Sequence, residues 1–153
     1  KKDSFAFSIV DINENIPIYI GDEINSSFLN NIDNFIVDFY ARCDESGFPL
    51  MFSNGQIKSK DNILSGRGEI VSNLFFTLKS KDKANGFIPK GKYAIGYVHG
   101  DYIDTNDIYK DLLTFIKENG FQVIGNSYEE YLLDELTESK QNQFMIRVMI
   151  QVA

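Results

Sequence analysis

The length, composition and charge of this chain favour one globular domain. It has 153 residues, 43% of them hydrophobic, which is enough apolar surface to build a core. Its 22 acidic and 15 basic side chains give a net charge of −7, so this chain is not expected to contact nucleic acid. No apolar run reaches the roughly 18 residues that a membrane-spanning helix needs. The single cysteine excludes an internal disulfide and fits a reducing cytoplasm.

The first half of the chain is predicted to contain strands on either side of an amphipathic helix. Segments rich in β-formers cover residues 5–12 and 17–20. Apolar residues then recur at helical spacing over 28–43, which puts Cys43 on the apolar face as a buried core thiol. Further strands are predicted at 49–52 and 71–78, and the polar stretch between them, 53–68, is predicted to be a long hairpin loop.

The second half is predicted to repeat this pattern. A strand over 92–99 precedes an amphipathic helix that carries Ile108, Leu112 and Ile116 on one face. That helix follows Asp104-Thr105 and should end near Asn119-Gly120, because glycine readily takes the left-handed conformation of a helix cap. The remaining strands are predicted over three ranges, 121–124, 128–133 and 144–152.

A spacing of 72 to 73 residues relates the two halves. The Gly47-Phe48 pair returns as Gly120-Phe121, and the apolar alternation of 74–78 returns at 146–150. We therefore predict an α+β fold with two pseudo-symmetric βαββ repeats, about 5–80 and 86–153, in a single domain over 1–153. Each repeat would hold an antiparallel sheet and one main helix, with a central groove between them that suits a ligand.

The candidate binding residues are a carboxylate and several tyrosines. Within the strand 128–133, Glu129 and Tyr131 should point to one face, where a carboxylate needs a compensating partner. That partner could be Arg147 on the last strand or a cationic ligand, and an exposed position for Glu129 is the alternative. Tyr93 and Tyr97 share one face of their strand, opposite small residues suited to packing under the helix, so these tyrosines should face the groove and form a wall opposite Glu129. Tyrosine rings attract flat cations.

The sequence gives little evidence for a metal site or for a catalytic nucleophile. The one histidine, His99, has no second histidine or cysteine nearby to share a metal, so no metal or cofactor is expected. No Ser–His–Asp or Cys–His grouping is evident, and the chain is not expected to be an enzyme.

Several short motifs in a fixed order resemble the GyrI-like effector-binding domain family. They are Lys92-Tyr93-Ala94-Ile95, His99-Gly100-Asp101-Tyr102, Asn119-Gly120-Phe121, Gly125 and Glu129-Glu130-Tyr131-Leu132, with an amphipathic helix between the second and third. The likeness covers mostly the last 65 or so residues. It implies a cytoplasmic sensor at the C-terminus of a MerR- or AraC-type transcription regulator, which binds hydrophobic, frequently cationic drugs in an aromatic pocket above an acidic residue.

The resemblance assigns the acidic role to Glu129, or to Glu130 if the strand register shifts by one. The chain departs from the family in its last strand, where Arg147 and Gln151 should face the groove and Arg147 could neutralise Glu129. The ligand-binding residues predicted from these arguments are Glu129, Tyr131, Tyr93, Tyr97, Tyr102, Tyr40 and Arg147.

The resemblance also implies a parent protein. We expect a DNA-binding portion to belong to a longer parent chain and to be absent from this one, and we expect the parent to dimerise through other regions. Two alternatives stay open. One is a stand-alone GyrI-like hydrolase with Glu129 as general base, and the other is a gyrase-modulating protein.

Overall fold

The described part of the chain is built mainly of strands. A computed structural model describes residues 7–24, 26–27, 54–99, 106–133 and 144–153. The strands are β1 Ser8–Ile12, β2 Ile16–Ile20, β3 Ser26–Ser27, β4 Asn54–Lys58, β5 Ile70–Val71, β6 Asn73–Thr77, β7 Gly86–Ile88, β8 Gly91–His99, β9 Val123–Leu133 and β10 Phe144–Val152. The helices are α2 Lys60–Leu64 and α3 Asn106–Glu118.

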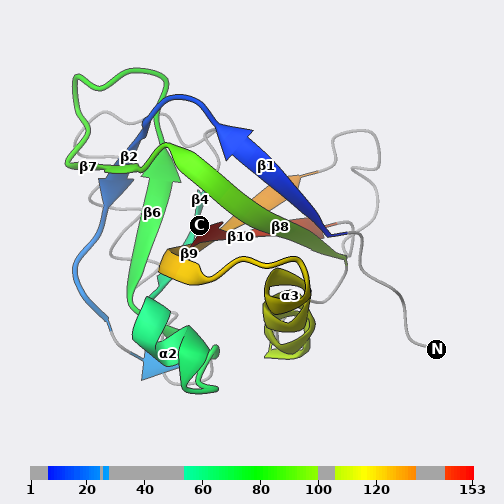
Figure 1. Ribbon diagram of the computed structural model, residues 1–153. Helices are drawn as coiled ribbons and strands as arrows, with labels where there is room; N and C mark the ends of the chain where they lie inside the picture. Colours follow the sequence, from blue (N-terminus) through cyan, green and yellow to red (C-terminus); the bar gives the residue numbers. More distant parts are fainter. Residues whose placement is uncertain (1–6, 25, 28–53, 100–105, 134–143) are drawn as a thin grey trace.

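Eight of the strands form one antiparallel sheet in the order β1-β8-β10-β9-β4-β6-β2-β7, and β3 pairs with β5 beside it (Figure 1). The middle of the large sheet is the β4–β9 pair, which joins the two halves of the chain. From this pair the strands run outward as β9, β10, β8 on one side and β4, β6, β2 on the other. The α+β character agrees with the prediction. The two-copy repeat stays a prediction, because the helix expected over 28–43 lies outside the described residues.

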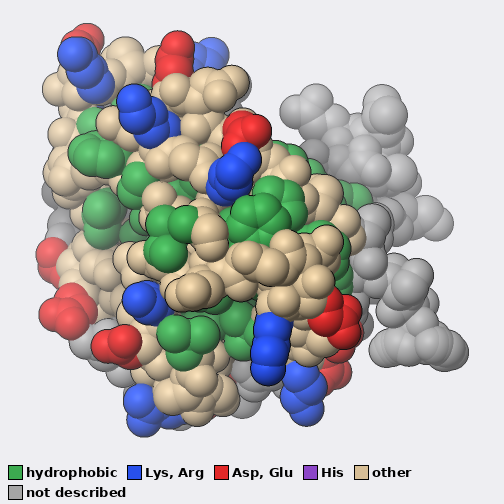
Figure 2. Space-filling view, in the orientation of Figure 1, with side chains coloured by type: hydrophobic (Ala, Val, Ile, Leu, Met, Phe, Trp, Pro, Cys, Tyr) green, Lys and Arg blue, Asp and Glu red, His purple; other side chains and the backbone are tan. Residues whose placement is uncertain are grey.

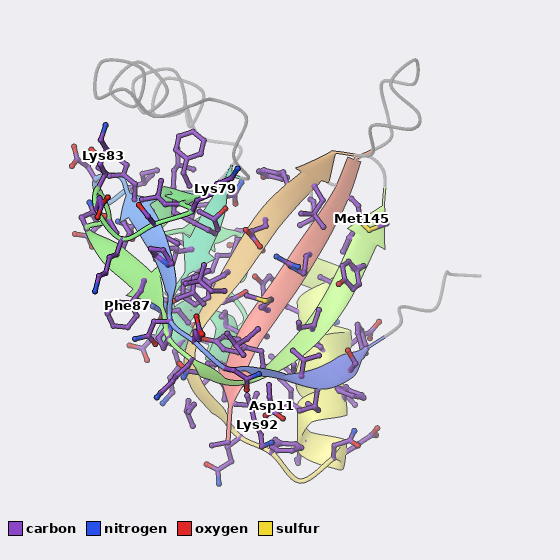
Figure 3. All side chains as sticks on the ribbon, turned by 90° about the horizontal axis from the view of Figure 1, so that it is seen from above. Asp11, Lys79, Lys83, Phe87, Lys92 and Met145 are labelled. Atoms are coloured by element: carbon purple, nitrogen blue, oxygen red, sulfur yellow. The ribbon has the colours of Figure 1, made fainter. Side chains whose placement is uncertain are left out.

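The sheet is curled and buries apolar side chains on both of its faces. On one face, Leu112 of α3 and Ile63 of α2 belong to the same buried cluster as Val148 of β10, so both helices cover this face. We call it the helix face. The other face holds a second cluster, in which Ile18 of β2 and Tyr93 of β8 come together from strands near opposite edges of the sheet. Those edges approach each other because the sheet curls around this second cluster (Figures 1 and 3).

The helix and the final strand that were predicted in the second half of the chain are confirmed. Ile108, Leu112 and Ile116 are buried on α3, whereas the intervening polar residues are exposed. The helix stops where expected, with Gly120 at φ 82° and the Phe121 amide donating to the Ile116 carbonyl at 3.0 Å. The final strand also matches its predicted range, as β10 covers Phe144–Val152.

The predicted loop over 53–68 is wrong. This segment forms strand β4 and helix α2, and α2 starts where the Ser59 hydroxyl accepts a hydrogen bond from the Asn62 amide at 3.2 Å. The strands predicted at 121–124 and 128–133 are a single strand, β9, which runs through Gly125. The strand predicted at 49–52 and the helix carrying Tyr40 and Cys43 lie outside the described residues. Among the helices of the described ranges, none is long and apolar enough to span a membrane.

Candidate functional site

A group of buried polar side chains lies on the helix face where β4 meets β9. Gln56 pairs with Glu129 in the register of these strands, and Lys58 pairs with Ser127. Side chains of residues paired across antiparallel strands share one face of the sheet. Together with Tyr109 of α3, which packs above them, these residues form what we call the polar cluster: Gln56, Lys58, Tyr109, Ser127 and Glu129.

Glu129 is the centre of the polar cluster and is only 2% exposed. The Nζ atom of Lys58, itself 4% exposed, lies 2.8 Å from Glu129 Oε2. The hydroxyl of Tyr109 donates a hydrogen bond of 2.5 Å to the same oxygen. Taking two charges out of water is costly, and such a pair persists only with good geometry and additional hydrogen bonds. Lys58 and Tyr109 provide that compensation for Glu129.

Tyr109 connects the helix to this ion pair. Its hydroxyl also lies 2.7 Å from the Ser127 Oγ atom, and its ring centroid lies 5.2 Å from Lys58 Nζ. Burial, the negative charge of Glu129 and the hydrogen bond to that carboxylate all raise the pKa of Tyr109 well above its ordinary value. The phenol therefore stays protonated at neutral pH and can keep donating to Glu129.

A second hydrogen bond extends the polar cluster along β9. The Gln56 amide donates to the hydroxyl of Tyr131, which is partly buried and packs against the apolar cluster beneath α3. Glu129 and Tyr131 thus share a face, as the strand alternation predicted. Tyr131 is partly buried and therefore more exposed than the members of the polar cluster, and we call it the rim of the cluster.

The expectation that Tyr93 and Tyr97 face the same groove as Glu129 is wrong, because they lie on the opposite face of the sheet. The register places Gly96, Val148 and Glu129 in one row across the sheet, so residues 93 and 97 point to the opposite face. Tyr93 is fully buried there and donates a hydrogen bond of 2.5 Å to the Pro89 carbonyl. Tyr97 is 37% exposed. The small residues under the helix were predicted correctly, since Ala94 is buried in the cluster that includes α3.

Arg147 does not neutralise Glu129. It forms an ion pair with Glu130, its cross-strand partner, on the face opposite the helices. Burial on its own would lower the pKa of Arg147, but the Glu130 carboxylate and Tyr97 beside it raise that pKa on balance. Glu129 and Glu130 therefore lie on opposite faces, each with its own cation.

Sequence reasoning missed Lys58, Gln56 and Tyr109. The first two lie in the segment that was predicted to be a loop, and Tyr109 was hidden in an amphipathic helix. The sequence did contain a signal for this strand. The shift of 72 residues that relates the two halves makes Asn54–Lys58 equivalent to residues 126–130, which belong to the last predicted hairpin. Applied to that segment, it would have predicted a strand there.

Two predicted ligand contacts, Tyr40 and Tyr102, lie outside the described residues, and so does the side chain of His99. Within the described ranges, no group of three His, Cys, Asp or Glu side chains could hold a metal ion. The contacts of the polar cluster are an ion pair and hydrogen bonds.

The chain is similar to a bacterial regulator. No family model matches it. In an alignment of 114 positions that covers 71% of this chain, it is 32% identical to the "Multidrug-efflux transporter 2 regulator" of Bacillus subtilis (strain 168). It spans only 38% of that protein's length.

Solved structures share the fold at low sequence identity. The crystal structure of the EcmrR C-terminal domain superposes with a TM-score of 0.67 at 12% identity, covering 98% of this chain and 97% of that one. EcmrR in a DNA complex gives a TM-score of 0.71 at 12% identity over 97% of this chain and 57% of that one. A hydrolase from Listeria innocua gives 0.54 at 8% identity, covering 96% and 91% of the two chains. At these identities the likeness concerns the fold alone.

Proposed function

Because its sequence and fold support its assignment to the GyrI-like effector-binding domains, we propose that this chain is the small-molecule sensor of a transcription regulator that works in the cytoplasm. Its similarity to a multidrug-efflux regulator supports the regulatory role. Its superposition on the EcmrR C-terminal domain supports a sensing module that can be separate from the DNA-binding part. The parent chain would dimerise through regions other than this one.

The observation that carries this proposal is the buried polar cluster around Glu129. A purely structural core would be more stable with apolar residues at Lys58 and Glu129, because burying an ion pair costs desolvation energy. Proteins tolerate such departures from an apolar core mostly at functional sites. Here the cluster lies at the central β4–β9 pair, and the partly buried Tyr131 forms its rim.

A ligand at this rim would be hydrophobic and aromatic. It would stack on Tyr131 and hydrogen-bond to the Gln56–Tyr131 pair. We propose further that the two βαββ repeats meet about a pseudo-two-fold between β4 and β9, which would place the ligand at the junction of the two halves. Ligand binding would then favour one arrangement of the halves and transmit a signal through differential affinity.

A melting screen tests the binding function. A panel of lipophilic cations, anions and neutral aromatics should contain compounds that raise the melting temperature, since a ligand at a hundred times its Kd adds about 2.7 kcal/mol. Tyr131→Ala should abolish the shift, because it removes the aromatic rim. Tyr97→Ala is the matched control on the opposite face and should keep it. A panel in which no compound stabilises the wild type, or in which Tyr97→Ala alone loses the shift, would contradict the proposed function.

A hydrolase is the second candidate, and the fold shared with the Listeria innocua hydrolase favours it. Glu129 is poorly placed to act as its general base, because it is 2% exposed and its Oε2 atom already contacts Lys58 and Tyr109. An assay with small electrophilic esters tests this candidate. Turnover that disappears in Glu129→Gln would establish the hydrolase, whereas background rates in both proteins would exclude it for those substrates.

A further inference from the structure

The ammonium group of Lys58 occupies the place that a ligand cation would take next to Glu129. It lies 2.8 Å from the carboxylate and 5.2 Å from the centroid of the Tyr109 ring. A carboxylate together with an aromatic ring is the combination that attracts an organic cation. The charge of Glu129 is therefore already compensated from within the chain.

We infer that Lys58 sets the charge selectivity of the site, so that it takes neutral aromatic ligands in preference to permanent cations. This inference rests on the proposed function, because it concerns the ligand of the same site. It reverses the cation preference that a lone buried carboxylate predicts.

The energetic reason lies in the exchange that a cation would require. To reach Glu129, a ligand cation would have to displace Lys58, which is 4% exposed, and leave a second positive charge without its carboxylate. If Lys58 stays, the ligand cation faces a neutral pair and loses its own hydration without gaining a counter-charge. A neutral aromatic ligand meets neither cost, since it leaves the ion pair intact and gains apolar contact with Tyr131.

Polar contacts hold the Lys58 ammonium in this place rather than leaving it to move aside. Lys58 extends from the last position of β4, whose register with β9 sets it opposite Ser127. Tyr109 donates to the same carboxylate oxygen that Lys58 contacts, and Tyr109 is fixed in turn by the buried face of α3. The ion pair is therefore part of the packed core and not an adjustable surface contact.

The test uses two probes of nearly the same shape and different charge. N-methylquinolinium is a permanent aromatic cation, and methylnaphthalene is its neutral isostere. Calorimetric titration of the wild type should show methylnaphthalene binding more tightly by about tenfold or more, which corresponds to about 1.4 kcal/mol. Lys58→Met should shift the ratio of the two affinities toward the cation by about tenfold or more, because it exposes the Glu129 charge to the ligand.

Two further variants separate local from general charge effects. Lys92→Met removes one positive charge from an exposed pair with Asp11, far more open than Lys58, and should leave the ratio unchanged (Figure 3). The double variant Lys58→Met with Glu129→Gln removes both charges and should return the ratio toward that of the wild type. If Lys58→Met does not fold, the wild type still decides, since the inference fails if the wild type prefers the cationic probe.

The possible results distinguish a failure of the charge-selectivity inference from a failure of the proposed function. A wild type that prefers N-methylquinolinium overturns the role of Lys58 while leaving the binding function intact. The same holds if folded Lys58→Met keeps the wild-type ratio, or if Lys92→Met shifts it equally. If neither probe nor any compound of the melting panel binds the wild type, the proposed function fails and this inference fails with it.

Discussion

At the scale of single residues, the main feature is that each of two adjacent glutamates has its own cation. Glu129 pairs with Lys58 on the helix face, and Glu130 pairs with Arg147 on the other. Strand alternation alone separates Glu129 from Glu130, but it does not choose their partners. The partners follow from which strands lie next to β9, namely β4 on one side and β10 on the other.

Replacement of Lys58 should strongly destabilise the domain. Lys58→Met leaves Glu129 buried and without its cation, so we expect a loss of about 3–5 kcal/mol in the free energy of unfolding. The exposed pair provides the matched control, since Lys92→Met should cost less than about 1 kcal/mol. Urea denaturation measures both. Equal losses for the two variants would mean that the buried pair is solvated and contributes little.

The stability of the domain should fall at high pH, and Tyr109 should account for part of the fall. Its pKa is raised in the folded state, so above about pH 10 the unfolded chain releases a proton that the folded chain retains, and folding is disfavoured. The contribution is fully present below that pH. Burial also raises the pKa of Tyr128 and Tyr93, which add to the effect.

Tyr109→Phe checks this contribution. The variant should be less stable than the wild type at neutral pH, by about 1–3 kcal/mol, because Glu129 loses a hydrogen bond. Its stability should then decline less steeply above pH 10, by up to about 1.4 kcal/mol per pH unit. Urea titrations at several pH values give both quantities. Parallel pH profiles for the two proteins would show that Tyr109 does not titrate differently in the folded state.

At the scale of elements, the β4–β9 pair joins the two halves of the chain at the middle of the sheet, and Gly55 permits the close approach of these two strands. A Cβ atom at Gly55 would lie 1.9 Å from the backbone oxygen of Glu129 and 2.9 Å from a ring carbon of Phe75. No rotation of a side chain can relieve contact with a backbone atom. Only glycine therefore fits at this position of the central pair.

Gly55→Ala should separate β4 from β9. We expect a loss of about 3 kcal/mol, the upper end of the range for overpacked positions, because the backbone of Glu129 must shift and weaken the Lys58 contact. Gly86→Ala is the control, since its Cβ would meet only the flexible end of the Ile20 side chain at 2.7 Å. Urea denaturation compares the two. Comparable stability of the two alanine variants would show that β4 and β9 adjust without cost.

At the scale of the whole molecule, the main feature is the negative net charge of the chain. The chain carries a net charge of −7. On the face shown in Figure 2, Lys and Arg side chains are scattered among Asp and Glu and form no continuous basic patch. Phosphate binding relies on such a patch, so the charges on this face do not favour contact with DNA.

This charge predicts that the chain alone does not bind duplex DNA at physiological salt. A gel-shift assay with random duplex DNA should show no retarded band, because net repulsion is not offset by clustered cations. The DNA band should show no shift in the presence of this chain even at low salt, where electrostatic binding is strongest. A band that weakens as salt rises would show that a basic surface exists and that the charge argument is wrong.

The sequence by itself determined the elements whose signals are local. The periodic apolar residues of α3, its glycine stop at Gly120 and the long apolar strand β10 all depend on neighbours in the chain, and all were predicted correctly. The placement of Glu129 and Tyr131 on one face followed for the same reason, since alternation is a property of the strand itself.

Only the tertiary structure decided which strands pair and which charges meet. Asn54–Lys58 is polar and contains glycine, so its local preference indicated a loop, yet its central position between β6 and β9 makes it a strand. That position brings Lys58 to Glu129, while the register of β8 and β10 turns Tyr93 and Tyr97 away. Strand neighbours and register arise from contacts between residues distant in sequence, and local patterns carry no information about them.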